Sequence, residues 1–342
     1  MNPSATEAQL NRVLSRYRLG RLKAAWRPAH GFINDNWIVE TSAGRCFVKH
    51  RHPTLAEPAF IAAQHALTRW LRRHGFPAPA LLPTVDGDTL LILGRECYEV
   101  QEYIEGSEYD HSRAAHLEEA AATLARHHAL VRGFASAVLC FPGELYHPRL
   151  LRTNLTRLAE TWQLDKDNGL ARLHSKLRAE ASDLAKHFAK HGNLHELLIH
   201  GDYYADNLLF DGDRIVGVVD YDKACWQPRV VELAEALIYF ASPRPGNLRH
   251  LVYPGVLQWE PFAGFLQAYA RVTVPDESEM QVLPDYIRCI WLQVSLQRLW
   301  EQGRRPTRAL EALEEVLGLA GWARANAATM IEICHSAIEQ PS

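Results

Sequence analysis

The chain lacks several features that mark membrane, secreted or metal-binding proteins. No apolar run among its 342 residues approaches the roughly 18 residues of a membrane span. Its six cysteines (46, 97, 140, 225, 289 and 334) are scattered and form no Cys-x-x-Cys pair. This spacing predicts reduced thiols in a cytoplasmic protein, and the N-terminus carries no apolar signal region. We therefore expect a cytoplasmic location and no membrane partner.

A strong excess of one charge is also missing. The formal net charge is −3, and charged residues make up 23% of the chain. Proteins that bind nucleic acid usually carry a basic patch or stripe, so we expect no nucleic-acid partner. Hydrophobic residues make up 47%, which is typical of a globular enzyme. The length is large for one hydrophobic core and favours two lobes.

What the chain does contain is a polar motif between short apolar strands, in residues 197–223. The predicted strands are 197–199, 208–210 and 215–219. Asp211-Gly212 predicts a two-residue type I′ turn, which needs positive φ. Asp220 follows Asp202 by eighteen positions, but the hairpin folds this distance back on itself. We therefore expect the side chains of Asp202, Asn207 and Asp220 to converge.

These residue types suit phosphoryl transfer. That reaction needs a metal held by hard oxygen ligands and a carboxylate that orients the attacking hydroxyl. Asn207 and Asp220 suit the metal, and Asp202 suits the base. Any one of them alone commonly caps a turn. The complete pattern of His-Gly-Asp, four residues, Asn, hairpin and Val-Val-Asp favours the catalytic interpretation.

The segment resembles the catalytic core of the aminoglycoside phosphotransferase and choline kinase superfamily, which has a protein-kinase-like fold. The resemblance implies that Asp202 is the catalytic base and that Asn207 and Asp220 bind Mg²⁺. It implies that His200 is a structural residue that fixes the loop. Asp222 is a candidate for a second metal contact or for a cap of the hairpin. The implied fold class is α+β, with a small, mainly β N-lobe containing one main helix and a larger, mainly α C-lobe.

The first hundred residues fit such a small lobe. Apolar patterns predict strands at 32–40, 45–50, 90–93 and 97–101, with a helix at 55–74. Lys49 lies at the end of its strand; the resemblance implies a contact with the α- and β-phosphates, and the alternative is an exposed strand lysine. Residues 30–35 resemble the phosphate-covering loop, especially that of type II homoserine kinases. This implies nucleotide contacts at Gly31 and Asn34.

The family usually supplies a helix glutamate that pairs with the lysine. Here the expected position falls on Gln64, and the nearest acid, Glu57, lies near the helix start, just before Pro58. Gln64 is therefore a candidate to hydrogen-bond Lys49 without an ion pair.

Residues 101–106 are predicted to connect the two lobes. In the kinase-like fold, connector backbone hydrogen-bonds the nucleotide base, which implies a site at Gln101, the Glu102 carbonyl and the Ile104 amide. We expect an N-terminal nucleotide-binding lobe at 1–102, with a leading helix, and a C-terminal lobe at 103–342. The C-terminal lobe would carry the catalytic loop, the metal site and the acceptor pocket.

The second lobe is predicted to be helical from residue 112 onward, apart from the hairpin. Residues 229–240 predict an amphipathic helix, and its Glu232 either braces the catalytic loop or is an ordinary helix charge. Gly201 stands where protein kinases have an arginine that anchors an activation-loop phosphate. The short distance from Asp220 to this helix leaves no room for such a loop. The sequence thus favours a small-molecule kinase over a regulated protein kinase.

The predicted cofactors are ATP and Mg²⁺, and the predicted reaction moves the γ-phosphoryl group to a hydroxyl of a small molecule. The acceptor is homoserine-like, amino-alcohol-like, sugar-like or aminoglycoside-like. The alternative is a nucleotide-binding pseudokinase that acts as a scaffold or regulatory protein. The missing helix glutamate favours that alternative, and the complete set of Asp202, Asn207 and Asp220 opposes it.

Overall fold

The computed structural model describes residues 3–28, 34–134, 146–164, 168–191, 194–243, 256–303 and 305–339. They form two compact units. The first contains the described residues of Met1–Tyr109, Leu130–Phe141 and Asp206–Cys225, and the second contains those of Asp110–Ala129, Pro142–Ala205 and Trp226–Ser342. The expected lobe boundary after residue 102 stays a prediction.

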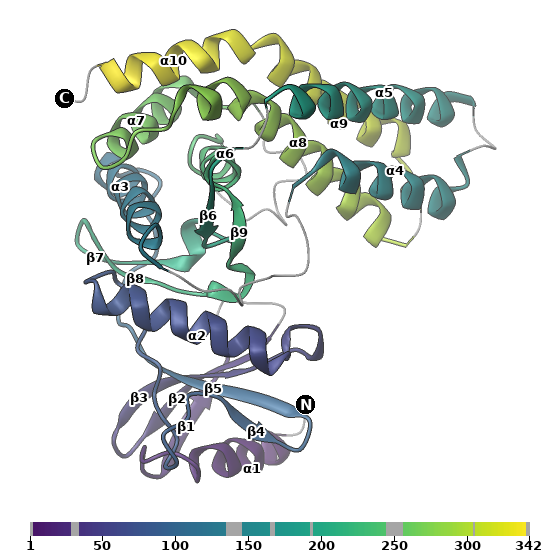
Figure 1. Cartoon of the computed structure of the whole chain (residues 1–342). Helices are drawn as coiled ribbons and strands as arrows, with labels where there is room; N and C mark the ends of the chain where they lie inside the picture. The colour runs from purple at the N-terminus through teal and green to yellow at the C-terminus, as the bar shows by residue number, and fades with distance from the viewer. Residues whose placement is uncertain are drawn as a thin grey trace. The chain divides into compact units, whose positions relative to one another are not determined.

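The first unit is built on a five-stranded antiparallel sheet with the strand order β1-β2-β3-β5-β4 (Figure 1). The strands are β1 Leu22–Trp26, β2 Asp35–Thr41, β3 Gly44–His50, β4 Leu91–Leu93 and β5 Glu96–Glu102. Four of them match the predicted strands. The prediction missed β1, whose sequence Leu-Lys-Ala-Ala-Trp has no β-branched residue and lies mostly exposed at the sheet edge.

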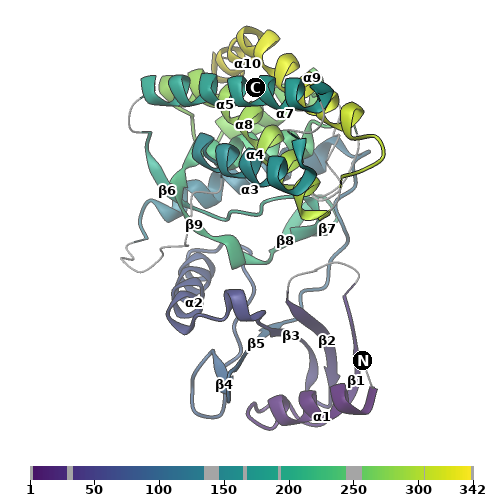
Figure 2. The same cartoon turned by 90° about the vertical axis from the view of Figure 1, so that its right-hand side faces the viewer.

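Two helices cover the two faces of this sheet (Figures 1 and 2). Helix α1, Pro3–Leu14, packs its apolar side on one face, as expected for the leading helix. The core there contains Leu10, Val13, Leu14, Tyr17, Trp37, Val39, Cys46, Val48, Tyr98 and Val100. Because successive strand side chains point to opposite faces, Lys49 points away from α1 and toward helix α2, Pro58–Arg73.

Helix α2 is shorter than predicted at its N-terminal end. Residues Pro53–Leu55 form a separate 3₁₀ turn, η1, and Glu57 is the N-cap of α2. Pro58 occupies the first helical position, where the absence of a backbone N–H costs nothing. Glu57 therefore lies outside the helix body.

The predicted hairpin consists of β7, Leu208–Asp211, and β8, Arg214–Val218. Its turn differs from the prediction. Asp211 pairs with Arg214, so the loop residues are Gly212 and Asp213, and only Gly212 has positive φ, at 59°. A type I′ turn needs positive φ at both positions, whereas type II′ turns place glycine at the first. The predicted type I′ turn at 211–212 is therefore wrong.

Backbone hydrogen bonds tie the hairpin to other segments of the first unit. The amide of Ser107 donates to the Phe210 carbonyl at 2.8 Å, and the Phe210 amide donates back at 2.9 Å. The Val218 amide donates to Pro77 at 2.7 Å. Gly106 allows this approach, because a Cβ there would lie 2.9 Å from the Leu209 Cβ. The hairpin is thus held in register with the segment that follows β5.

Several of the remaining helices pack against one long helix. Helix α8 packs against α4, α6, α9 and α10. The helix bounds are α3 Ala114–Val131, α4 Pro148–Trp162, α5 Asn168–Lys190, α6 Arg229–Phe240, α7 Trp259–Ala270, α8 Glu277–Glu301, α9 Ala309–Ala325 and α10 Ala327–Glu339. Strand β6, Glu196–Ile199, pairs with β9, Cys225–Pro228, which the prediction missed. Its sequence, Cys-Trp-Gln-Pro, lacks a clear strand pattern.

Helix α6 has the predicted bounds, but it is not amphipathic. All 12 of its residues are buried, including the charged ones. The Arg229 guanidinium meets the Glu279 carboxylate, with its Nε 2.8 Å from Glu279 Oε1, and bonds Thr273 Oγ1 at 3.1 Å. Buried charges of this kind require partners, so the polar positions of α6 face other elements rather than water.

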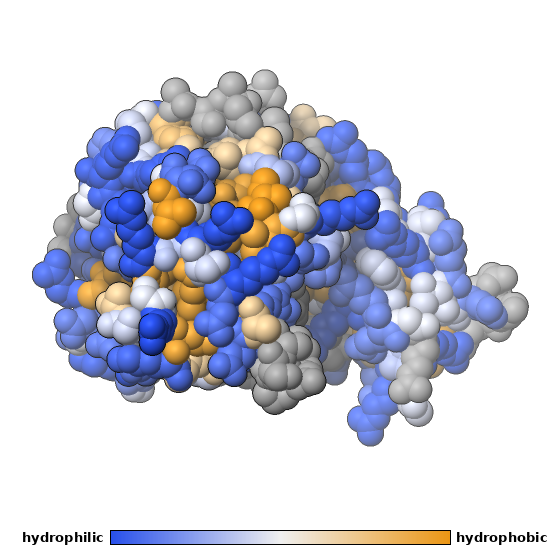
Figure 3. Space-filling model, turned by 90° about the horizontal axis from the view of Figure 1, so that it is seen from below, coloured by the Kyte–Doolittle hydropathy of each residue, from blue (hydrophilic) through white to orange (hydrophobic). Residues whose placement is uncertain are grey.

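Within the described ranges, none of the helices is both long enough and apolar enough to cross a membrane. The face in Figure 3 shows apolar side chains interrupted by hydrophilic ones. Exposed large apolar side chains of the first unit include Trp26, Val85 and Ile92.

Candidate active site

The predicted catalytic loop follows β6 in the second unit. Gly201 has φ of 79°, a conformation that glycine adopts without the Cβ clash of other residues. The backbone amide of Asp202 donates to His200 Nδ1 at 3.3 Å, and His200 is fully buried. His200 therefore contacts the backbone of the loop, as expected for a residue that fixes it. Asp202 itself is partly exposed.

Glu232 of α6 braces this loop. Its carboxylate accepts the backbone amides of His200 at 3.1 Å and Gly201 at 2.6 Å. It also accepts His128 Nε2 at 2.9 Å, and it has no exposed surface. The structure thus decides between the two sequence interpretations of Glu232: it is a brace, because it satisfies two amides next to the predicted base.

Two buried histidines of α3 support the same region. His127 Nε2 donates to the Leu198 carbonyl of β6 at 3.1 Å. His128 donates to Glu232 through Nε2, and its Nδ1 lies 2.6 Å from the Tyr269 hydroxyl. Burial lowers the pKa of His127 to about 3, which keeps this ring neutral near pH 7.

In the first unit, Lys49 forms ion pairs with Asp220, a predicted metal ligand, and with Asp222. Its side chain is 3% exposed, and Nζ donates to Asp220 at 2.8 Å and to Asp222 at 2.9 Å. Burial opposes the charged form, but attraction to Asp220 and Asp222 outweighs it and raises the pKa of Lys49. Lys49 is therefore a buried, charged partner of the motif and not an exposed strand lysine.

The two predicted metal ligands lie at adjacent positions of the hairpin's open end. The Val219 amide donates to the Asn207 carbonyl at 3.0 Å, directly before Asp220. Asp220 has φ 67° and ψ 64°, a left-handed conformation uncommon outside glycine and often found at functional sites. A carboxylate and an amide oxygen are donors that suit Mg²⁺, which also keeps waters and phosphates. The residues fit such an ion.

Asp202 belongs to the second unit, whereas Asn207 and Asp220 belong to the first. The expected convergence of all three side chains therefore stays a prediction.

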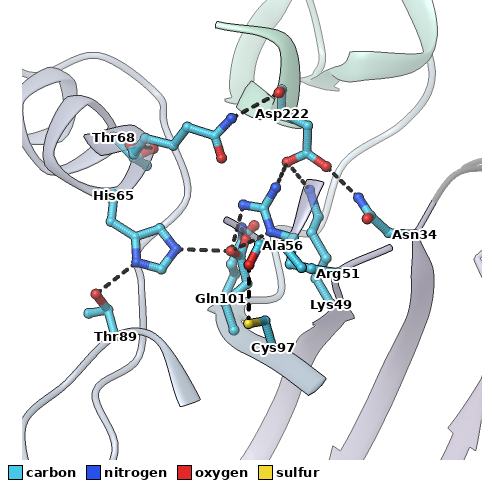
Figure 4. A network of polar contacts seen from close by, with 12 residues as sticks. Asn34, Lys49, Arg51, Ala56, His65, Thr68, Thr89, Cys97, Gln101 and Asp222 are labelled. Atoms are coloured by element: carbon cyan, nitrogen blue, oxygen red, sulfur yellow. Dashed lines mark hydrogen bonds and ion pairs between the residues drawn. The ribbon is translucent and has the colours of Figure 1, made fainter. Parts of the chain in front are cut away.

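Gln64 and Asn34 both contact Asp222, and Figure 4 labels Asn34 and Asp222. Gln64 Nε2 donates to the Asp222 backbone carbonyl at 2.8 Å, and its Oε1 has no hydrogen-bond partner among the described residues. Gln64 was a candidate to hydrogen-bond Lys49, but its amide instead donates to the backbone of Asp222. Asn34 donates to the Asp222 carboxylate and accepts the His52 amide at 2.8 Å. Gly31 lies in 29–33, outside the described residues.

The predicted connector begins later than expected. Gln101 and Glu102 are the last residues of β5, and Ile104 follows the strand. Gln101 Nε2 donates to Glu99 at 2.6 Å, while the Glu102 carboxylate accepts Arg72 at 2.6 Å. The side chains of Gln101 and Glu102 thus form hydrogen bonds within the first unit. The nucleotide-base contacts of Gln101, Glu102 and Ile104 stay predictions.

Sequence reasoning missed Arg51 and Glu99, on the Lys49 side of the sheet, and His65, which contacts Glu99. Glu99 pairs with Lys49 across β3 and β5, and Arg51 follows Lys49 by two positions. Both therefore lie on the Lys49 side of the sheet, and strand alternation applied to the charged residues would have indicated this.

A five-stranded sheet with one helix on the lysine face, followed by a hairpin and a helical unit, defines a protein-kinase-like architecture. Residues 26–280 match the model of the phosphotransferase enzyme family, and the chain belongs to this family. This confirms the resemblance drawn from the motif, and the protein is a small-molecule kinase.

Individual relatives agree in fold and extent. The homoserine kinase of Rhizobium meliloti (strain 1021) is 26% identical over 321 residues, covering 91% of this chain and 90% of that protein. The structure of an aminoglycoside phosphotransferase from Alicyclobacillus acidocaldarius has a TM-score of 0.68 at 16% identity, covering 94% and 95% of the two chains. An amicoumacin kinase in complex with AMP-PNP and Ca²⁺ has a TM-score of 0.65 at 13% identity, covering 96% of each.

Proposed function

We propose that the protein transfers the γ-phosphoryl group of ATP, in an Mg²⁺-dependent reaction, to a hydroxyl of a small amino alcohol such as homoserine. The observation that carries the proposal is the buried Lys49 ion-paired with Asp220, the residue that the family motif assigns to the metal. A charged lysine at this place stabilises the nucleotide phosphates. Asn207 and Asp220 would hold Mg²⁺, which supplies positive charge beside the phosphate oxygens.

Asp202 acts as the base in this proposal. Its carboxylate orients the acceptor hydroxyl and takes its proton, while the brace of Glu232 on His200 and Gly201 fixes the backbone just before it. A fixed loop matters because phosphoryl transfer depends mainly on positioning and electrostatics.

An acceptor with an ammonium group suits the surroundings of Asp202. Tyr146 donates to the buried Glu235 at 2.6 Å. Burial and the negative charges of Glu235 and Asp202 raise the pKa of Tyr146, so these acids act on one small region of the second unit. Negative potential attracts a cationic substrate. The homoserine kinase relative, which matches along most of both chains, points to the same class of acceptor.

Steady-state assays of ATP turnover over homoserine, ethanolamine, choline, sugars and aminoglycosides test this proposal. We expect Mg²⁺-dependent, saturable turnover, with the highest kcat/KM for an amino alcohol. The variant Asp202→Ala is the matched control: it should stay folded and lose about 10²- to 10⁴-fold in kcat. Nucleotide binding without turnover on any acceptor would instead support the scaffold alternative. Wild-type turnover in Asp202→Ala would remove Asp202 from the role of base.

A further inference from the structure

Lys49 has two carboxylate partners that differ in exposure. The Asp220 side chain is 34% exposed and belongs to the proposed metal site, whereas that of Asp222 is 10% exposed. An aspartate that ligates a metal ion has less negative charge to offer a lysine. Asp222 is thus the more buried partner, and the one whose charge a metal ion at Asp220 would leave to the Lys49 ammonium.

Protein groups already occupy both oxygens of the Asp222 side chain (Figure 4). Oδ1 accepts Lys49 Nζ at 2.9 Å and also accepts Arg51 Nη1, and Oδ2 accepts Asn34 Nδ2. A carboxylate surrounded in this way acts as an anchor for side chains, not as a second metal ligand.

Arg51 connects this anchor to the sheet. Its side chain is 2% exposed, and its Nε and Nη2 donate to Glu99 Oε2 at 3.0 and 2.6 Å, while Nη1 reaches Asp222. The guanidinium is planar and rigid, so it fixes the spacing of the two carboxylates it binds. The position of Asp222 is therefore set by β5 through Arg51.

Helix α2 also contacts this network, through Gln64, which bonds Asp222, and through His65, which contacts Glu99. His65 Nε2 lies 2.9 Å from Glu99 Oε2, and its Nδ1 lies 2.9 Å from Thr89 Oγ1. Gln64 donates to the Asp222 backbone, and neither residue is the acid that the family usually supplies at this helix. The more buried of the two Lys49 counter-ions is thus Asp222, two positions after Asp220.

We propose that Asp222 is the positioning residue of Lys49, in place of a helix acid, and that Arg51 and Glu99 hold Asp222 in that role. The order of groups is Asp220, Lys49, Asp222, Arg51 and Glu99, in which each cation lies between two carboxylates. Lys49 lies on β3 and Asp222 follows β8, so neither partner of this ion pair belongs to α2. The inference rests on the proposed function and deepens it.

The variant Asp222→Asn is the direct test, because it removes the charge and keeps the shape. We expect the Kd for ATP with Mg²⁺, measured by titration calorimetry, to rise about tenfold or more. The KM for ATP should rise in parallel, while the KM for the acceptor stays within about twofold. A Kd and a KM for ATP within about twofold of wild type would overturn the proposal.

A double-mutant cycle separates positioning from a general loss of structure. If Asp222 acts through Lys49, Asp222→Asn should change the Kd for ATP by less than about twofold in a Lys49→Met background. Full additivity of the two substitutions would show that Asp222 acts by another route, and would overturn the proposal.

Two further variants keep the test valid if Asp222→Asn folds poorly. Arg51→Lys retains the positive charge but loses the planar guanidinium that bonds both Glu99 and Asp222. We therefore expect a Kd for ATP about threefold or more above wild type. Arg288→Met removes another buried guanidinium, which pairs with Glu180 and Asp183, and should lower Tm while leaving the Kd for ATP unchanged. An unchanged Kd in Arg51→Lys, or equal Kd changes in both variants, would contradict the proposed role of Arg51.

The readouts distinguish this inference from the proposed function. A wild-type protein that binds ATP but phosphorylates no acceptor overturns the proposed function, and the calorimetric cycle still tests Asp222. Normal turnover with an unaffected Asp222→Asn variant overturns only the role of Asp222.

Discussion

Two buried carboxylates, one in each unit, anchor the residues of the proposed site in different ways. Asp222 in the first unit is met mainly by cations, from Lys49 and Arg51. Glu232 in the second unit is met by the backbone amides of His200 and Gly201 and by His128. The first anchor orients a charged side chain, whereas the second fixes the course of the backbone. Removing charge should therefore affect nucleotide binding most at Asp222, and removing acceptors should affect stability most at Glu232.

The largest expected effect is that of Glu232→Ala. The substitution leaves two buried loop amides and the His128 N–H without their acceptor. We expect the free energy of unfolding to fall by about 3 to 5 kcal/mol, measured by urea denaturation. We also expect kcat to fall, because the loop that carries Asp202 is no longer fixed.

Glu232→Gln sharpens this prediction, because it keeps one acceptor oxygen and removes the charge. It should retain part of the stability lost in Glu232→Ala, since hydrogen-bond acceptance is what the amides require. Equal losses in both variants would show that the charge matters more than the acceptors, and the contrast with Asp222 would disappear.

The fold was predictable where the pattern of residues is local. Apolar periodicity predicted the strands of 35–50 and the bounds of α6, and the spacing of Asp202, Asn207 and Asp220 indicated the family. The failures have local reasons as well. The glycine of the hairpin serves the first loop position instead of the second, and β1 has a composition that does not favour strands.

The partners of the site residues were harder to predict, because they depend on tertiary contacts. The sequence shows a glutamine at position 64 but not that it bonds the backbone of Asp222. It shows an acid at position 232 but not whether that acid faces solvent or the loop. The Lys49–Glu99 pairing follows from the register of β3 and β5, which a single sequence does not fix.

The pH dependence of the free energy of unfolding tests whether His127 is buried as a neutral ring. The folded-state pKa of His127 is depressed to about 3, so the folded protein does not protonate this ring near pH 5. The unfolded chain does, because an unperturbed histidine has a pKa of about 6.5. Stability should therefore be complete above pH 6.5 and fall by about 1.4 kcal/mol per pH unit below it, or about 2 kcal/mol at pH 5.

The variant His127→Gln isolates this contribution from those of other titrating groups. Urea denaturation of both proteins between pH 8 and pH 5 should give a shallower pH dependence for the variant, since glutamine does not titrate. Parallel curves for the two proteins would contradict a buried, neutral His127.

The smallest expected effects come from two glycines, one in each unit, where no charge is involved. A methyl group at Gly217 would lie 3.1 Å from side-chain carbons of Ile104 and Leu209, which is tighter than ordinary packing. Gly217→Ala should therefore cost about 1 kcal/mol. It should weaken ATP binding a few-fold if the Ile104 amide contacts the nucleotide base.

Gly264→Ala in α7 is the matched control, because its methyl group would lie 3.6 Å from Leu117, an ordinary contact. Alanine is the better helix former, so this variant should gain about 0.5 to 1 kcal/mol and leave the Kd for ATP unchanged. Opposite signs of the two stability changes, with altered ATP binding only in Gly217→Ala, would show that neutral packing in the first unit also positions the nucleotide. An ATP affinity that stays at the wild-type value in a destabilised Gly217→Ala variant would instead confine that positioning to the charged groups around Lys49.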